Sequence, residues 1–254
     1  MSKIAHHPKL CLFLGASVVE PLTVITEAMS GGSVRGLLEK SKVRTALEAV
    51  ARPSKRHSWL PLRLQLAPST TSQRWSAALE YPFPPAVQEP LPWERRVEIA
   101  LDGALGMAFL HKCDPPVIHR DLKTDNMLLT LHGHAKLADF GFTKTMTATH
   151  AAEHEICGTP GFMAPEMYDE DEGAAGYDEE ADVFAFGMTI YEMLTMGGWP
   201  YGKVDWMQIE KLVTKGRPPT VGGPKIPTDT PAGFLKCHTQ SIELKPVRHV
   251  EHAP

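Results

Sequence analysis

The stretch VIHRDLKTDNMLLT, residues 117–130, holds three polar side chains whose types and spacing suit catalysis. Asp121, Lys123 and Asn126 lie two and three residues apart in a short polar loop between apolar runs. A carboxylate that binds no metal can orient an attacking hydroxyl and accept its proton. A lysine beside it can neutralise the charge on a transferring phosphoryl group. The loop therefore has the residue types of a phosphoryl-transfer site.

A second carboxylate, Asp139, follows at the end of the apolar segment AKLADF. This segment and MLLT are predicted to be two strands joined through Gly133, a hairpin that returns Asp139 towards the loop. Asn126 and Asp139 then supply amide and carboxylate oxygens, which are hard ligands suited to Mg²⁺. Hydrolysis by two paired acids would leave the lysine and the asparagine idle, so the set favours phosphoryl transfer.

Two apolar runs near the start of the chain, LCLFLG and LTVITEAM, are bounded by prolines and glycines. Short apolar runs between such residues are typical of strands, and these two are predicted to pair. Ser33 follows them, and its hydroxyl is a suitable N-cap for a helix that begins there.

Two further helices are predicted around the loop. From Trp93 to about His111, apolar residues recur at helical spacing and form one stripe. That stripe consists of Val97, Ala100, Leu101, Ala104, Leu105 and Ala108. The later segment DVFAFGMTIYEMLT is apolar on nearly every face, so it should be a helix inside a larger domain that Gly197, Gly198 and Pro200 end.

Two parts of the chain lack such patterns. Residues 40–92 are rich in Pro, Ser and Arg and keep no hydrophobic period, which indicates an insertion or a disordered linker. Residues 221–254 are rich in Pro and Gly, and no compact element is predicted there.

The composition excludes several classes of protein. The chain has 254 residues, 43% hydrophobic and 22% charged, so it can form a sizeable core. A formal net charge of −4 gives no reason to expect nucleic acid or an anionic membrane as a partner. The four cysteines form no CxxC pair, no apolar run could span a bilayer, and the N-terminus lacks a secretion signal. We therefore expect a cytoplasmic protein without membrane insertion.

Four motifs follow one another along the chain: HRDLK with Asn126, DFG at 139–141, APE at 164–166, and DVFAFG from Asp182. HRD or DFG alone is a weak signal, but the four in order and at these separations are not a chance match. With them the chain resembles the protein kinase family, which uses ATP and Mg²⁺.

The resemblance implies a role for each site residue. Asp121 is the base that orients the substrate hydroxyl, and Lys123 contacts the γ-phosphate. Asn126 holds one Mg²⁺, and Asp139 holds the Mg²⁺ that bridges the phosphates. Phe140 of the DFG motif is a packing residue with no chemistry of its own.

The same resemblance narrows the substrate class. Lys in HRDLKTDN and the Gly-Thr pair of CGTPGFMAPE are typical of serine/threonine kinases, and the chain looks most like their tyrosine-kinase-like group. The segment TEAM is then the adenine-binding hinge, with Thr26 as a small gatekeeper and the backbone of Glu27 to Met29 facing adenine; a plain buried strand is the alternative. Thr159 is expected to bind the catalytic loop rather than to accept phosphate.

The implied fold is α+β: a mainly α-helical C-terminal lobe with a partial β-rich N-terminal lobe. In this scheme residues 1–39 are the partial N-terminal lobe, 40–92 an insertion, 93–220 the C-terminal lobe and 221–254 an atypical tail. No glycine-rich loop, VAIK-like lysine or partner glutamate precedes His6, so we expect a truncated N-terminal lobe.

Three functions remain open at this point. The first is an ATP-dependent kinase whose partner is a protein with a Ser or Thr hydroxyl. The second is a catalytically inactive, pseudokinase-like binding module. The third is a small-molecule phosphotransferase, which the DFG, GTP–APE and DVFAFG segments disfavour.

Overall fold

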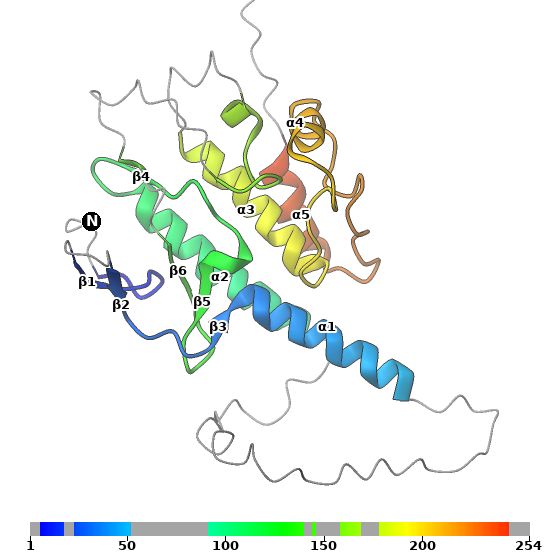
Figure 1. Ribbon diagram of the computed structural model, residues 1–254, viewed down its shortest axis with the longest axis horizontal. Coiled ribbons are helices and arrows are strands. Elements are labelled where there is room, and N and C mark those ends of the chain that lie inside the picture. Colours follow the sequence, from blue (N-terminus) through cyan, green and yellow to red (C-terminus); the bar gives the residue numbers. More distant parts are fainter. Residues whose placement is uncertain are drawn as a thin grey trace, which may run out of the picture.

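The computed structural model describes residues 6–17, 23–51, 91–139, 144–145, 158–168 and 178–243. Within these residues, helices form the bulk of the molecule and short strands lie to one side of them (Figure 1). The helices are α1 (Val34–Ala51), α2 (Trp93–His111), α3 (Glu179–Leu194), α4 (Trp206–Thr214) and α5 (Ala232–Ile242). This mixture of helices and small sheets agrees with the predicted α+β class.

Among the described residues, the strands form three small antiparallel sheets. β1 (Phe13–Ser17) pairs with β2 (Thr23–Thr26), as the two apolar runs predict. A three-stranded sheet has the order β3 (Gly32–Ser33), β5 (Met127–Leu129) and β6 (Ala135–Leu137). β4 (Val117–Ile118) pairs with β7 (Lys144–Thr145). The predicted hairpin of MLLT and AKLADF is therefore confirmed as β5–β6.

Helix α1 begins where the sequence predicts. The Ser33 hydroxyl accepts a hydrogen bond from Gly36 N–H at 3.1 Å, which confirms the N-cap. The helix runs past residue 39, where the insertion was expected to start, and ends at Ala51. The rest of the expected insertion, 52–90, lies outside the described residues.

Helix α2 has the predicted length but the predicted buried stripe is wrong. Four of its six members are exposed, namely Val97, Leu101, Leu105 and Ala108, while another face of the helix is buried. The reason is close packing at two glycines. A Cβ on Gly103 would lie 2.7 Å from the Met127 side chain, and one on Gly106 would lie 2.8 Å from the Lys9 carbonyl. Small residues let the backbone approach its neighbours, so they mark the buried face although they add no hydrophobic signal.

Helix α3 is buried on all sides, as the apolar segment predicts. From Ala181 to Leu194 every residue except Val183 is buried. The helix is capped by Asp178, whose carboxylate accepts a hydrogen bond from Glu180 N–H at 2.9 Å. α3 packs against α2 and α5 and forms the central support of the molecule (Figure 1).

Helix α5 lies in the tail where no compact element was predicted. It packs along α3, and the His238 ring makes a 2.9 Å hydrogen bond to the Gly187 carbonyl. A Cβ on Gly187 would lie 2.7 Å from Ile242 Cγ2, so the two helices touch closely at this glycine. The sequence pattern missed α5 because only Phe234 and His238 of the helix are buried.

Candidate active site

The centre of the candidate site is the buried carboxylate of Asp121. Its Oδ2 accepts hydrogen bonds from Lys123 Nζ at 2.7 Å and from Asn126 Nδ2 at 2.9 Å. Asn126 Nδ2 also donates to the Asp121 backbone carbonyl at 2.8 Å. The structure thus brings the three polar residues of the predicted loop into direct contact.

Thr159 completes the contacts of this carboxylate. Its hydroxyl donates to Asp121 Oδ1 at 2.6 Å and accepts from Lys123 Nζ at 2.6 Å. The contact requires Gly158, which has φ +121° and on which a Cβ would lie 2.9 Å from the Arg120 carbonyl. Thr159 therefore binds the catalytic loop, as the sequence suggests.

The backbone of the loop is held by Asp182 at the start of α3, a carboxylate with no exposed area. Asp182 Oδ2 accepts from His119 N–H at 2.8 Å and from His111 Nε2 at 2.8 Å. Its Oδ1 accepts from Arg120 N–H at 2.9 Å. Arg120 has φ +67°, a strained conformation, and the two backbone hydrogen bonds stabilise it.

The His119 side chain connects the loop to the segment that carries Asp139. His119 Nδ1 accepts from Asp121 N–H at 3.4 Å, so Nε2 carries the proton and donates to the Ala138 carbonyl at 3.0 Å. Ala138 N–H in turn donates to the Asn126 carbonyl at 2.9 Å. Asp139 directly follows and has φ +59°. The two expected metal ligands are therefore tied to each other through the backbone.

The donor set at this point fits Mg²⁺. Asn126 Nδ2 donates both of its hydrogen bonds to Asp121. The amide oxygen, Oδ1, therefore faces away from Asp121. The Asp139 side chain is exposed. Proteins commonly bind Mg²⁺ through only one or two side-chain oxygens, and water and phosphate oxygens supply the other ligands. Phe140 and Gly141 of the DFG motif lie outside the described residues.

The predicted adenine-binding segment begins at Thr26, the last residue of β2. Thr26 is exposed, and Glu27 and Met29 are half-buried. The Glu27 carboxylate accepts hydrogen bonds from Leu12 N–H at 2.7 Å and from Lys136 Nζ at 2.7 and 2.9 Å. Burial alone would raise the pKa of Glu27, but the hydrogen bonds from Lys136 and Leu12 outweigh it and lower that pKa. The Glu27 side chain thus joins the end of β2 to β6, and its backbone N–H donates to the Leu12 carbonyl at 2.9 Å.

The structure separates the predicted site residues into two groups. Asp121, Lys123 and Asn126 contact one another, with Asp139 linked through the backbone. The segment from Thr26 to Met29 reaches the same hairpin through the Lys136 contact, and among the described residues no hydrogen bond joins it to the loop itself.

Sequence reasoning missed the carboxylates that support the loop. Asp182 was identified only as part of a motif, and Glu192 was not singled out. Both lie in α3, a segment that is apolar on nearly every face. A charged residue in such a helix is costly to bury and must be paired. Acidic residues within this apolar segment therefore indicated that each has a buried partner.

Comparison with known proteins decides the family. The family described as protein tyrosine and serine/threonine kinase matches residues 1–247. The chain belongs to the protein kinase family. The resemblance drawn from the four motifs is therefore confirmed.

Several relatives are serine/threonine kinases by name. The chain is 28% identical over 235 residues to a putative serine/threonine-protein kinase/receptor, R826, of Acanthamoeba polyphaga mimivirus, covering 92% of this chain and 11% of that protein. It is 29% identical over 212 residues to serine/threonine-protein kinase CTR1 of Arabidopsis thaliana, covering 83% of this chain and 20% of that protein. It is 44% identical over 112 residues to serine/threonine-protein kinase pkpA of Phycomyces blakesleeanus, covering 43% of this chain and 17% of that protein.

The kinase chain spans only 11% to 20% of the length of these relatives. Within the described ranges, none of its helices combines the length and apolar character needed to cross a membrane.

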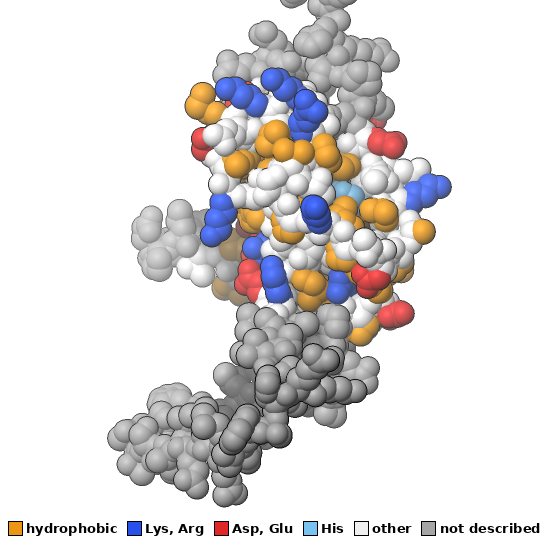
Figure 2. Space-filling model, turned by 90° about the vertical axis from the view of Figure 1, so that its right-hand side faces the viewer, with side chains coloured by type: hydrophobic (Ala, Val, Ile, Leu, Met, Phe, Trp, Pro, Cys, Tyr) orange, Lys and Arg blue, Asp and Glu red, His pale blue; other side chains and the backbone are white. Residues whose placement is uncertain are grey.

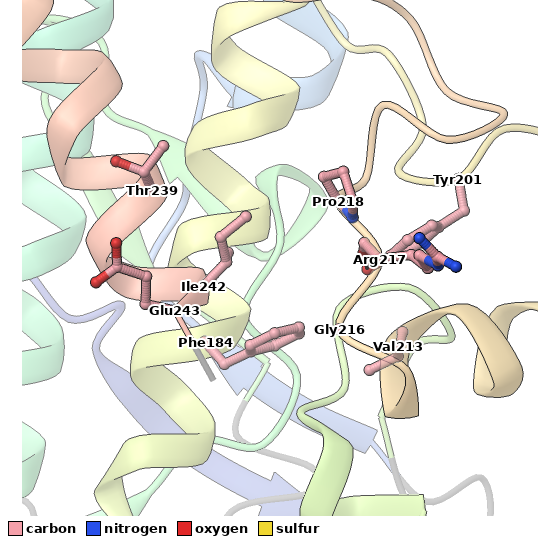
Figure 3. A pocket seen from close by; sticks show the side chains of 9 residues that line it. All are labelled: Phe184, Tyr201, Val213, Gly216, Arg217, Pro218, Thr239, Ile242 and Glu243. Carbon is pink, nitrogen blue, oxygen red and sulfur yellow. Dashed lines mark hydrogen bonds between the residues drawn. The ribbon is translucent and has the colours of Figure 1, made fainter. Parts of the chain in front are cut away.

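A separate cavity of about 460 Å³ lies away from this site, between α3, α4 and α5 (Figure 3). Apolar side chains such as Phe184, Val213 and Ile242 line it. None of the predicted site residues borders it.

Proposed function

We propose that the chain is a protein serine/threonine kinase of the tyrosine-kinase-like group, which transfers the γ-phosphoryl group of ATP to a protein hydroxyl. The observation that carries this proposal is the buried Asp121 carboxylate, held by Lys123, Asn126 and Thr159. A group oriented in this way before substrate arrives needs no further reorganisation during the reaction.

Asp121 acts as the base of the transfer. Each carboxylate oxygen has two acceptor positions, and Oδ1 accepts one protein hydrogen bond, from Thr159. The substrate hydroxyl donates to the remaining position, and its oxygen attacks the γ-phosphorus. The bond to the β-phosphate oxygen breaks, ADP leaves, and the hydroxyl proton passes to Asp121.

Lys123 balances the charge near the reacting atoms. Its ammonium group already contacts Asp121 Oδ2 and the Thr159 hydroxyl, and a third donor remains on the nitrogen. That donor contacts a γ-phosphate oxygen and stabilises the charge that develops there.

Asn126 and Asp139 hold magnesium in this proposal. When bound, Mg²⁺ neutralises the phosphate oxygens and aligns the leaving group. Two hydrogen bonds fix the amide of Asn126, and the contacts through Ala138 keep Asp139 next to it. On the other side of the nucleotide, the backbone of Glu27 and Met29 binds adenine, with Thr26 as the small residue at the entrance.

The choice of a Ser or Thr hydroxyl rests on Lys123 in the HRDLKTDN loop, on Thr159, and on the printed names of the relatives. Lys123 and Thr159 contact each other and both contact the Asp121 carboxylate, which supports this choice.

The direct experiment is transfer of radiolabelled phosphate from Mg·ATP to a mixture of peptides that present Ser, Thr or Tyr. We expect label on Ser and Thr only, and a loss of about 10²–10⁴-fold in the Asp121→Asn and Asp139→Asn variants. Glu98→Gln is the matched control, because it makes the same carboxylate-to-amide change at an exposed position of α2.

Each other outcome has a definite meaning. A folded wild-type chain that transfers no label refutes the kinase proposal and favours the pseudokinase-like binding module. Label on small molecules without any label on peptides favours the small-molecule phosphotransferase. Label on Tyr alone contradicts the substrate class.

A further inference from the structure

A second buried carboxylate, Glu192, contacts the catalytic loop from the other end of α3. Its side chain has no exposed area. Glu192 Oε2 accepts hydrogen bonds from Thr124 N–H at 3.1 Å and from the Thr124 hydroxyl at 2.8 Å. Thr124 is the first residue of the short 3₁₀ turn Thr124–Asn126. This turn follows Lys123 and ends at the expected metal ligand Asn126.

The counter-charge of Glu192 comes from Arg35 in the first turn of α1. The Arg35 guanidinium donates to Glu192 Oε1 through Nη1 and to Glu39 Oε1 through Nε at 2.7 Å. It also lies over the Trp199 ring, with 5.5 Å from Cζ to the ring centre. In the described residues this is the one cation that contacts the Glu192 carboxylate.

The two contacts of Arg35 are not equivalent. The Glu39 side chain is 56% exposed, so its ion pair with Arg35 is solvated and adds little. The Glu192 side chain is enclosed, and a buried carboxylate without its cation is strongly disfavoured. Burial raises the pKa of Glu192, while Thr124 and Arg35 oppose that change.

We propose that Arg35 is a positioning residue of the kinase reaction. It holds the Glu192 side chain aligned, so that one carboxylate oxygen accepts both donors of Thr124. Thr124 then fixes the turn from which Lys123 and Asn126 project. This inference rests on the proposed function for its effect on rate, and on the contacts alone for its effect on the loop.

The position of Arg35 gives it a further consequence. α1 follows the predicted adenine-binding segment, with only β3 between them. The chain of contacts from Arg35 through Glu192 to Thr124 therefore joins the nucleotide side of the site to the phosphate side. A shift of α1 that pulls Arg35 away would misplace Lys123 and Asn126 without touching either residue.

The test is a set of variants at the two carboxylates and the arginine. Arg35→Met removes the cation and keeps the apolar stem, and we expect kcat to fall by about a hundredfold while KM for the peptide changes little. The Mg²⁺ concentration for half-maximal rate should rise, since Asn126 is misplaced. Glu39→Gln is the matched control, because it breaks the exposed contact of the same guanidinium and should leave kcat unchanged.

A double variant separates positioning from stability. Arg35→Met combined with Glu192→Gln removes both charges of this pair, and the glutamine oxygen can still accept from Thr124. We expect this protein to fold and to recover part of the lost kcat. Arg35→Lys keeps the charge with a different shape and should lie between wild type and Arg35→Met.

A second readout does not depend on catalysis. Amide hydrogen exchange at Thr124 and Asn126 should quicken in Arg35→Met and stay as in wild type in Glu39→Gln. Unchanged exchange at these amides overturns the inference, even if wild type shows no kinase activity. Unchanged kcat in folded Arg35→Met, or a double variant no better than the single one, overturns it as well.

Discussion

The catalytic loop and the β1–β2 sheet differ in what holds them. The loop contacts two carboxylates of α3, Asp182 and Glu192, both with no exposed side-chain area. In β1 and β2, large apolar side chains face outward instead, with Leu14 59% and Val24 66% exposed. Figure 1 shows the sheet at one side of the molecule and α3 at its centre. Buried carboxylates of a helix therefore hold the loop in position, whereas few contacts hold the sheet.

Those few contacts join the sheet to β6. The Leu12 backbone and the Glu27 carboxylate bond to each other, and Glu27 pairs with Lys136. Leu137 N–H donates to the Lys9 carbonyl at 2.9 Å, and Cys11 N–H donates to the Leu137 carbonyl at 2.7 Å. Regions with few buried apolar contacts open at lower free energy than the core, so the β1–β2 sheet should be less stable than the loop.

The largest effect is expected from the loss of the Asp182 carboxylate, which holds the backbone of the loop. Asp182→Ala leaves the amides of His119 and Arg120 and the ring of His111 without their acceptor. We expect a loss of about 3–5 kcal/mol in the free energy of unfolding, measured by urea denaturation. Glu180→Gln, an exposed change in the same helix, should cost less than about 0.5 kcal/mol. Equal effects of the two changes would contradict the role of Asp182.

A matched pair of truncations compares the regions directly. Leu137→Ala in β6 removes a fully buried side chain and should cost about 2–5 kcal/mol. Ile25→Ala in β2 removes a side chain that is 51% exposed and should cost less than about 1 kcal/mol. Urea midpoints of the two variants measure the difference. A cost for Ile25→Ala as large as that for Leu137→Ala would show that the β2 face is packed after all.

Breaking the link between sheet and hairpin should have a smaller effect. Lys136→Met removes the partner of Glu27 at a half-buried position, so we expect a loss of about 1 kcal/mol. Amide exchange at Leu12 should quicken, while exchange at Thr124 in the loop stays as in wild type. Faster exchange at both amides would mean that the two regions open together.

The weakest expected effect is a dependence on pH. The folded pKa of Glu27 lies below its ordinary value of 4.5, so its contribution to stability is present above pH 4.5. It is lost as the pH falls through the folded pKa, when the carboxyl group takes up a proton. The difference in free energy of unfolding between wild type and Glu27→Gln, measured by urea denaturation, should therefore shrink below pH 4.5. A difference that grows on acidification would contradict the direction of this pKa shift.

Much of the fold followed from local patterns. The β5–β6 hairpin has a turn at Gly133 between two apolar strands, and α3 is apolar all round, so each could be predicted from its own residues. The contacts within the loop were also foreseeable, because Asp121, Lys123 and Asn126 are close in sequence.

What failed depends on packing between distant segments. The buried face of α2 is set by Gly103 and Gly106, whose lack of a side chain carries no hydrophobic signal. The Arg35–Glu192 pair joins residues far apart in the chain, and no short pattern announces such a partner. α5 was missed because it buries little of its own surface and depends on α3.

In the proposed reaction the loop performs phosphoryl transfer, with Asp121 as the base and Asp139 as a ligand of the magnesium that accompanies ATP. The most direct test measures the Kd for Mg·ATP and the rate of γ-phosphoryl transfer in Asp121→Asn and Asp139→Asn together. We predict that Asp121→Asn binds Mg·ATP as wild type does and loses transfer, whereas Asp139→Asn loses both. Transfer that survives in Asp121→Asn, or Mg·ATP binding that survives intact in Asp139→Asn, would contradict the account.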